Sequence, residues 1–495
     1  MISIQKELNF NACSELYDAL VNKDRFLPRF HDEVDLSFVF NELVDRYCPD
    51  NGRPAIDPVF LFKCLIIKVI TNLSDQDLME EIRVNLEYKY FLDMAPMDLP
   101  PDSSTLCVFR RQRLKDENMM DLLLSQTLKM AMERGIIKRS NIDGKAHINI
   151  IMDATHTESM HGLCRPVPML KQLSEKLRFA IYTCEPTAVG ELERDHDISN
   201  TSLIEELAYG HRLLDSIENR YPHLLSVKKV SQKFNRFKEL LEDVADHYSV
   251  NPADADARVG HKSADTEFFG YKSHIAIDED SRLIIDAEVT SGEVGDAIPG
   301  KEIVDRIARK DDLKIDEMLG DTAYSGQPFL ESAENNGFKL IAPAHPNLGS
   351  GIDGRDGFTF NKDADMFCCP KGHMAIAKRT ATYKRDNNRK AIIYTFDKNK
   401  CAVCPLRSTC LKGKAKARTF SVSVLTAEQK RLLKDQQTEY FKLRRRQRYK
   451  IEQKNAHLKQ GYSMSKTQGK GIEMMSLQAA VAFFTSNIKI ILAKK

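Results

Sequence analysis

The sequence predicts a mixed α/β fold: a central sheet with flanking helices, preceded by an all-helical N-terminal domain and interrupted by a small cysteine-bearing insert. Three observations lead to this prediction. Apolar residues recur at helical spacing near the start of the chain, short β-rich runs then alternate with helices, and paired cysteines follow the last strand. Strands that alternate with helices in this way form a sheet covered by helices.

Composition places few limits on function. The chain has 495 residues, of which 42% are hydrophobic, and this length allows roughly three domains. Its 73 basic and 71 acidic residues nearly cancel, so only local runs of charge can indicate a nucleic-acid partner. We expect no signal peptide and no membrane partner, since no apolar run approaches the ~20 residues of a membrane span. Eleven cysteines in such a chain favour a reducing, cytoplasmic location.

The region from about residue 36 to residue 131 has the apolar spacing of helices. Ser74 precedes acidic residues in the pattern of a helix start. A second helix, expected after the run PPDSS, carries the cations Arg110, Arg111, Arg113 and Lys115. A basic helix of this kind fits a DNA groove, but an ordinary solvated helix face has the same composition.

A β-rich run over residues 146–159 predicts the first strand, which reaches Asp153 and then turns polar. A buried strand that delivers an acid has this pattern, although an aspartate at a strand end is also a common turn residue. The long helical segment that follows, about residues 165–250, is expected to be an insertion of amphipathic helices that pack on one another or on a neighbouring domain.

Further strands are expected at residues 271–279 and 283–291, joined as a hairpin by a short Asp-Ser-Arg turn. A helix over residues 302–310 precedes another short strand, which stops at Asp321, and residues 338–346 form one more strand. Two acids, Asp153 and Asp321, are therefore expected at strand ends.

A cysteine-bearing insert is expected over residues 350–425. Two thiolates separated by two residues can reach one metal ion, and a Cys-Pro-x-Gly turn can help to complete a tetrahedron. The expected ligands of a structural Zn²⁺ are Cys369, Cys401, Cys404 and Cys410, with Cys368 or His373 as substitutes. A reduced thiol cluster without metal is the alternative. Because no ligand position is left open, the site would be structural rather than catalytic.

Residues 441–460 are predicted to form one helix, since they are mostly strong helix formers without Gly or Pro. The residues that share one face of this helix are Arg448, Glu452, Asn455 and Lys459. A single carboxylate among cations fits a helix that lies along a polyanion and offers one oxygen ligand to a hard cation. An apolar helix over residues 475–491 should pack against the sheet.

Asp153, Asp321 and Glu452 stand out by their positions. Three converging carboxylates can hold two Mg²⁺ (or Mn²⁺) ions about 3.5–4 Å apart, and such a pair stabilises the attacking and leaving oxygens of a phosphoryl transfer. Arg448 and Lys459 would then hold the phosphates of the DNA strand. The nearest rival acids, in or near the hairpin strands, are Asp278, Asp286 and Asp296.

Several stretches resemble the DDE transposases of bacterial insertion sequences. The runs GRPAIDPVFLFKCLIIKVITNLSDQDLMEEI and PPDSSTLCVFRRQRL resemble the N-terminal helical domain of that family, and DADARVGHKSADTEFFGYKSHIAID and GDTAYSG resemble its core. The family signature is Tyr, two residues, Arg, three residues, Glu, six residues, Lys. Arg448, Glu452 and Lys459 fit it, whereas Arg445 stands at the Tyr position. The cysteine insert is similar to one in a subset of these transposases.

The resemblance implies a ribonuclease-H-like fold and makes Asp153, Asp321 and Glu452 the DDE triad. It implies that water cuts double-stranded DNA at the inverted-repeat ends and that the freed 3′-hydroxyl then attacks target DNA. A homodimer or higher oligomer would pair the two ends. The residues expected to contact DNA phosphates are Arg448, Lys459, Arg445, Arg110 and Arg113.

The expected domains are a helical DNA-binding domain over residues 1–135, a catalytic core over 145–348 and 430–495, and the zinc-ribbon-like insert over 350–425. Two other functions fit the same residues: a metal-dependent nuclease of the same fold, and a DNA-binding protein that descends from a transposase and is no longer catalytic. A zinc hydrolase centred on His156 or His373 would need an open metal position with a ligand spacing that the sequence lacks.

Overall fold

The structure is a computed structural model that describes residues 14–494 apart from 48–54, 115–117, 163–165, 194–201, 247–250, 252, 264–265, 346–347, 349–356, 384–388 and 412–414. Several positions used in the predictions lie outside the described residues. They are Lys115 of the expected basic helix, residues 165 and 250 at the two ends of the helical insertion, residue 346 at the end of the last expected strand, residue 350 at the start of the cysteine insert, and residues 1 and 495 at the ends of the expected domains.

The N-terminal region is helical, as predicted. Its helices are α1 (Ser14–Leu20), α2 (Phe26–Glu33), α3 (Ser37–Leu43), α4 (Pro58–Thr71), α5 (Asp75–Val84), α6 (Leu86–Phe91), α7 (Ser103–Val108) and α8 (Met119–Glu133). The expected helix start at Ser74 is confirmed, because its side chain accepts a hydrogen bond from the Asp77 backbone N–H. The expected basic helix is shorter than predicted: α7 stops at Val108, and a wider π-helical turn carries Phe109–Arg113.

A six-stranded mixed sheet forms the centre of the molecule. Its strands are β1 (Ala146–Glu158), β2 (Arg258–Ser263), β3 (Thr266–Asp278), β4 (Ile284–Ser291), β5 (Leu313–Leu319) and β6 (Lys339–Ile341). The order is β2-β3-β1-β5-β6, with β4 also paired to β3. β1 is antiparallel to β3 and parallel to β5, so the sheet is mixed, and the predicted hairpin of β3 and β4 is confirmed.

Two strand predictions need correction. The strand predicted over residues 146–159 is confirmed as β1, but the expectation that Asp153 stands at its end is wrong, because β3 continues to pair with β1 as far as Glu158. The last strand, expected over residues 338–346, is reduced to Lys339–Ile341, since it pairs with β5 only at those residues.

Helices cover the sheet and form its rim. They are α12 (Ala297–Ala308), α13 (Gln327–Asn336), α17 (Ala427–Asp435), α18 (Glu439–Arg445), α19 (Tyr449–Gly461) and α20 (Gly471–Ala493). The single helix predicted over residues 441–460 is wrong in one respect: a 3-10 turn at Arg446–Arg448 separates α18 from α19. Arg444 ties α18 to Glu279 and Glu317, while α19 packs on β1, and the tightened turn accommodates both attachments.

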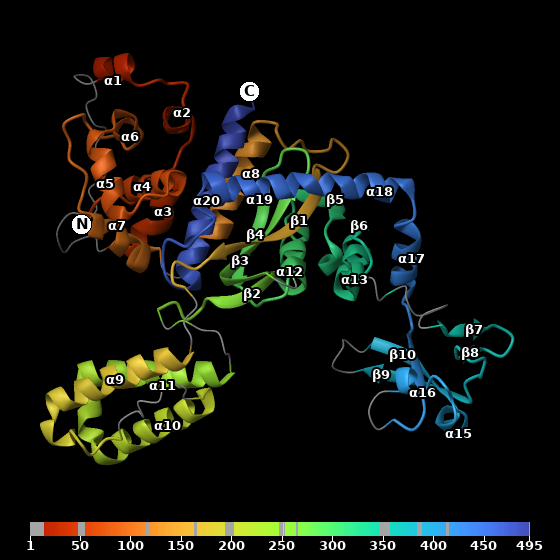
Figure 1. The fold of residues 1–495 in the computed structure, drawn as a ribbon. Helices are drawn as coiled ribbons and strands as arrows, with labels where there is room; N and C mark the ends of the chain where they lie inside the picture. The colour runs from red at the N-terminus through yellow and green to blue at the C-terminus, as the bar shows by residue number, and fades with distance from the viewer. Residues whose placement is uncertain are drawn as a thin grey trace.

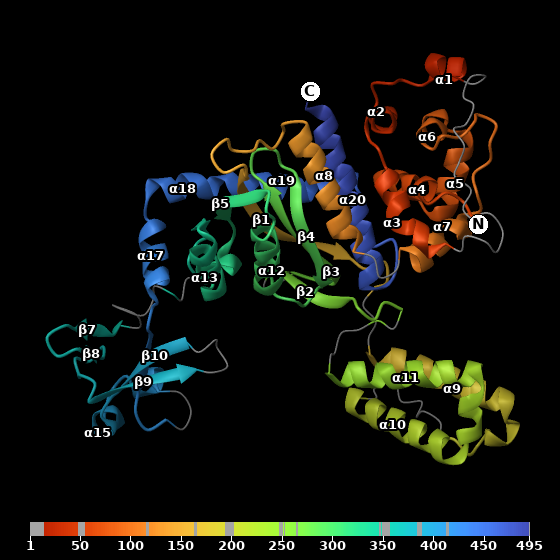
Figure 2. The same cartoon turned by 180° about the vertical axis from the view of Figure 1, so that it is seen from behind.

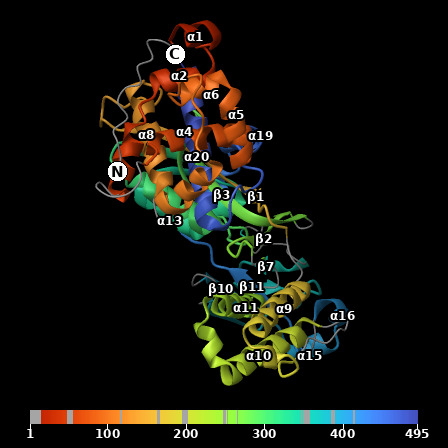
Figure 3. The ribbon, with the colours of Figure 1, turned by 90° about the vertical axis from the view of Figure 1, so that its left-hand side faces the viewer.

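The predicted helical insertion consists of α9 (Pro166–Cys184), α10 (Leu203–Arg220) and α11 (Lys228–Asp246), which pack on one another around a core of their own. The cysteine-bearing insert contains β7 (Thr359–Asn361), β8 (Met366–Cys368), β9 (Ala377–Tyr383), β10 (Arg389–Thr395), α15 (Lys398–Ala402), α16 (Arg407–Cys410) and β11 (Thr419–Ser423). It too has its own small, largely aromatic core. Both project to the same side of the sheet, away from the helices α1 and α2 (Figures 1 and 3).

The N-terminal helices, by contrast, share one hydrophobic core with the sheet. The predicted apolar C-terminal helix is confirmed as α20, which lies between the N-terminal helices and the strands (Figure 2). α20 is long and apolar enough to cross a membrane, but most of it is buried inside the protein, as expected of a core helix.

Candidate active site

The first two predicted acids lie side by side because of strand register. β1 and β5 run parallel, and their last paired residues are Ile151 and Leu319. Asp153 and Asp321 each follow that pair by two positions, so both acids lie at the same end of the β1–β5 pairing. Asp321 begins a 3-10 turn and accepts a 2.8 Å hydrogen bond from the Ala323 backbone N–H, which fixes its carboxylate.

Asp153 is held from the α19 side. Asn455 Nδ2 donates a 3.0 Å hydrogen bond to Asp153 Oδ2, and Arg448 Nη2 lies 3.7 Å from Asp153 Oδ1. Burial raises the pKa of Asp153 to about 6; the Arg448 guanidinium opposes this shift, and the negative charge of Asp321 adds to it. The two aspartates therefore carry negative charge that the surrounding protein only partly neutralises.

Glu452 lies on the same helix but is solvent-exposed. Arg448 precedes it by four residues and Asn455 follows it by three, and both of those side chains reach Asp153. Glu452 thus lies on the helix face that meets β1. Its carboxylate makes no hydrogen bond or ion pair with the residues that the structure describes. The structure brings Asp153 and Asp321 together and leaves the third predicted acid at the rim.

A further group of polar residues adjoins the aspartate pair. Asp296, directly before α12, accepts a 3.0 Å hydrogen bond from Lys272 Nζ, and His274 Nδ1 lies 3.9 Å from its carboxylate. Its charge also raises the pKa of Asp153. Tyr324, three residues after Asp321, is buried beside all three aspartates. The pKa of Tyr324 is raised well above its ordinary value. Burial is the largest cause, and the negative charges of Asp296, Asp153 and Asp321 add to it.

The sequence-based reasoning missed part of this group. Asn455 was placed on the correct helix face but given no role, and Asp296 was named only as a rival acid. Tyr324 gave no signal beyond its place in GDTAYSG. Four buried polar atoms in this region have no hydrogen-bond partner among the described residues: Arg448 Nε, Asn455 Oδ1, His274 Nδ1 and Tyr324 OH.

The basic side chains predicted to contact DNA differ in whether other residues of the protein already pair with them. Lys459 Nζ lies 3.2 Å from Nδ1 of His156, which is on β1, the same strand as Asp153. Arg445 is exposed on α18. Arg110, in contrast, forms a paired hydrogen bond with Asp75. Arg113 donates to the Arg46 carbonyl and stacks on Tyr47.

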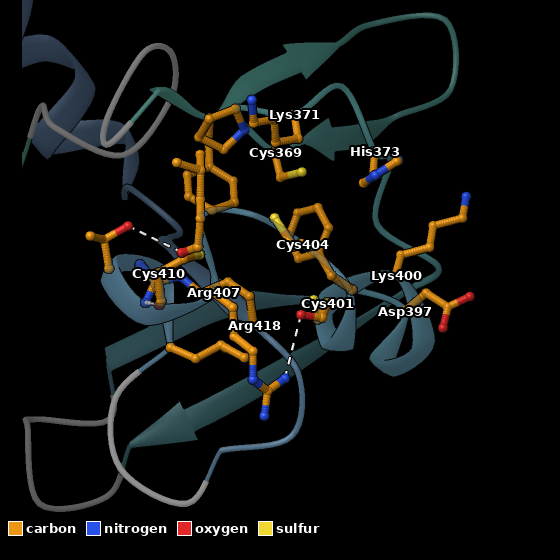
Figure 4. Close-up of a pocket in the computed structure, with 16 residues that line it drawn as sticks. Cys369, Lys371, His373, Asp397, Lys400, Cys401, Cys404, Arg407, Cys410 and Arg418 are labelled. Carbon is orange, nitrogen blue, oxygen red and sulfur yellow. Dashed lines mark hydrogen bonds between the residues drawn. The ribbon is translucent and has the colours of Figure 1, made fainter.

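The predicted zinc ligands Cys369, Cys401, Cys404 and Cys410 line one cavity of about 560 Å³, and His373 lines it as well (Figure 4). Burial raises the pKa of the Cys410 thiol, and the neighbouring cysteines add to this shift. Cys368, the other predicted substitute, does not line the cavity. Across the described part of the chain, no group of three or more His, Cys, Asp or Glu side chains is placed so that it could hold a metal ion.

Two known families match the sequence. Residues 15–112 match the family described as "Transposase domain (DUF772)", and residues 209–488 match the family described as "Transposase DDE domain". A solved structure, the piggyBac transposase synaptic complex with hairpin DNA, aligns with 94% of this chain and 73% of that chain at 10% identity and a TM-score of 0.31, a likeness too weak to support an argument. A comparison with curated proteins gives no match.

Proposed function

This chain belongs to the transposases with a DDE domain, since that family match covers residues 209–488 of 495, and from this premise we propose that Asp153, Asp321 and Glu452 form its catalytic triad. Members of the family cut DNA strands and transfer them, so the chain is a polynucleotidyl transferase. Asp153 precedes the matched segment, and its assignment rests on the register of β1 with β5.

The observation that carries the triad proposal is the register of β1 with β5, which places Asp153 and Asp321 two residues beyond the last pair of the two parallel strands. The two aspartates offer carboxylate oxygens, which are suitable ligands for Mg²⁺ or Mn²⁺. The two negative charges repel each other, and a divalent cation bound between them would remove this repulsion. The unpartnered Oδ1 of Asn455 beside Asp153 adds an oxygen atom that faces the same region. The residues present therefore fit a divalent cation.

A bound cation would stabilise negative charge on the attacking and leaving oxygens of the scissile phosphate. The chain's own residues prepare the site for it. The Asn455 amide orients Asp153 by a direct hydrogen bond, and the Ala323 N–H orients Asp321. Glu452 completes the set when its exposed side chain rotates toward Asp153 from the shared face of α19, a movement that breaks no hydrogen bond or ion pair with the described residues.

Double-stranded DNA is the proposed partner, as element ends and as target. Arg448 and Lys459 flank the triad and are suited to hold phosphates of the cut strand, with exposed Arg445 one turn further along. Arg110 and Arg113 remain proposed contacts of the N-terminal region, but both must first give up internal partners. Because two DNA ends must be paired, we propose a homodimer or higher oligomer, acting in the cytoplasm on the nucleoid.

We also propose that the core has the ribonuclease-H-like fold. The strand order supports this proposal. β4, β3 and β1 are antiparallel neighbours, β5 pairs with β1 in parallel, and β6 pairs with β5 in parallel. This order puts the middle strand β1 next to β5, and each of the two aspartates follows the last pair between these strands by two residues.

The triad proposal is tested by cutting DNA that carries the element's own ends in the presence of Mg²⁺. Asp153→Asn, Asp321→Asn and Glu452→Gln should each lower strand cleavage on the order of 10³-fold or more while DNA binding persists. Glu439→Gln is the matched control, because this exposed acid on α18 forms an ion pair with Lys442, three residues further along the same helix. Cleavage at the wild-type rate by any of the three variants would remove that residue from the triad.

Zinc in the cysteine insert is a separate proposal, supported by the four cysteines around one cavity. Cys404→Ser should reduce the zinc content of the purified protein and lower the melting temperature of the insert, because a structural zinc ion contributes folding energy. Cys184→Ser, an exposed cysteine on α9, is the control. Metal analysis that finds no zinc in the wild-type protein would contradict the proposal.

The second candidate function, a nuclease that cuts without strand transfer, uses the same three acids. Incubation with pre-cut ends that carry a 3′-hydroxyl and with plasmid target separates the two. Joined products support the transposase, whereas cutting without joining under all metal conditions supports the nuclease.

A further inference from the structure

The ring of Tyr324, a residue outside the predicted triad, is tightly packed by its neighbours. It fits between Gly300 of α12 and Gly320 at the end of β5. A Cβ atom at Gly300 would lie 2.6 Å from ring atom Cε1, and one at Gly320 would lie 2.7 Å from Cδ2. Phe329 of α13 packs edge-on against the ring, with centroids 5.4 Å apart. Two glycines thus make room for an aromatic ring that has little freedom to shift.

The hydroxyl at the end of this ring has no hydrogen-bond partner among the residues that the structure describes, although Tyr324 is only 1% exposed. Buried polar groups are almost always paired, and an exception calls for a partner in another state of the protein. After burial, the negative charges of Asp296, Asp153 and Asp321, in that order, raise the pKa of Tyr324. The Tyr324 hydroxyl is therefore a hydrogen-bond donor without a described partner at the edge of the acidic site.

Asp296 is anchored on its other side. Lys272 Nζ donates to Asp296 Oδ1 at 3.0 Å and to the Val294 carbonyl at 2.9 Å, which ties the loop before α12 to β3. His274 is fully buried next to the same carboxylate, and burial lowers its pKa to about 4, so it stays neutral at physiological pH. Lys272 is thus the one basic group that pairs with Asp296 among the described residues.

We propose that Asp296 and Tyr324 are positioning residues of the catalytic site: Asp296 supplies additional negative charge that strengthens divalent-cation binding by Asp153 and Asp321, and the Tyr324 hydroxyl hydrogen-bonds Asp296 when the cation is bound. This inference rests on the proposed triad. Asp296 is not assigned as a ligand, since Lys272 occupies one of its oxygens. Its contribution is the electrostatic potential at the site.

A merely structural role predicts something different. If the pair only supported packing, its removal would lower stability without changing how the protein responds to metal concentration. A role in cation binding predicts that removal raises the concentration of metal required and leaves the maximal rate largely intact. The two substitutions that separate these outcomes, Asp296→Asn and Tyr324→Phe, keep the shape of each side chain.

The test measures two quantities on the full chain. One is the Mg²⁺ dependence of strand cleavage on element-end DNA. The other is Mn²⁺ binding to the protein–DNA complex by titration calorimetry, which does not depend on turnover. Asp296→Asn should weaken both by about tenfold, since one charge near a divalent ion contributes on the order of that factor. Tyr324→Phe should weaken both by roughly threefold, because it removes one hydrogen bond. Excess Mn²⁺ should restore the cleavage rate in both.

Asp305→Asn is the matched control, because this acid lies on the same helix but bonds Lys301 and Ser332 instead of facing the site. Its metal dependence should be that of the wild type. Wild-type Mn²⁺ affinity in both Asp296→Asn and Tyr324→Phe would overturn the inference, even if Asp153→Asn is inactive. Normal cleavage by Asp153→Asn would instead overturn the triad itself, so the two failures are distinguishable.

Discussion

The N-terminal helices and the helical insertion are both all-α regions attached to one sheet, yet they are attached in different ways. The N-terminal helices have no separate core: α2, α3 and α4 contribute aromatic rings that surround Phe484 of α20. The insertion α9–α11 buries its apolar faces internally around its own core. Similar secondary structure therefore supports two kinds of domain, one fused to the catalytic sheet and one that is self-contained.

The difference has a consequence for how motion reaches the catalytic site. Asn487 of α20 hydrogen-bonds both the N–H and the carbonyl of Ile284 on β4, and it also bonds Thr127 of α8. We therefore expect a displacement of the N-terminal helices to reach the sheet through α20. Local opening of the insertion has no such route, because its core does not include strand residues.

The largest effect is expected from Phe484→Ala. This ring is fully buried, with Phe30, Phe38 and Phe62 centred about 6 Å away. Its removal should cost about 3–5 kcal/mol of unfolding free energy. Hydrogen exchange should accelerate in α4 and β3 together, since both regions depend on one core. Acceleration confined to the N-terminal helices would contradict the shared core.

A smaller and local effect is expected from Leu241→Ala in the insertion. Leu241 is fully buried, and α10 approaches it closely at Gly210. The substitution should cost about 2–5 kcal/mol, but only for the unfolding of α9–α11. Exchange in β3 should remain as in the wild type, and faster exchange there would show that the insertion is coupled to the sheet.

The smallest effect concerns a buried amine in the shared core. Lys454 on α19 donates a 2.7 Å hydrogen bond to Ser486 on α20, and burial lowers its pKa to about 7 from the ordinary 10.5. Between those values the unfolded chain binds a proton that the folded protein lacks, so stability rises with pH. The expected gain is about 2 kcal/mol from pH 7 to pH 9.

Lys454→Met tests this by removing the titrating group. As the pH rises from 7 to 9, the wild-type protein should gain about 2 kcal/mol of unfolding free energy that the variant does not gain, and the insertion should show no such change. A difference that does not vary with pH would mean that Lys454 stays protonated in the folded protein.

Much of the fold was readable from local patterns. The hairpin of β3 and β4, the cap at Ser74 and the apolar α20 all follow from residues that are neighbours in sequence. The strand over residues 146–159 was also recognised, but the position of Asp153 inside it was not, because the polar residues after Asp153 stay in β1 by pairing with β3. The break between α18 and α19 likewise carries no Gly or Pro as a signal.

The candidate site divides in the same way. Asp153, Asp321 and the face of α19 could be chosen from strand and helix context, since period and spacing are local properties. The nearness of Asp296, the slot around Tyr324 and the internal partners of Arg110 arise from contacts between residues far apart in the chain. Side-chain type and local period fix which elements form. Which acids meet, and which cations stay free for DNA, is decided only when those elements pack, because charge and burial depend on three-dimensional neighbours.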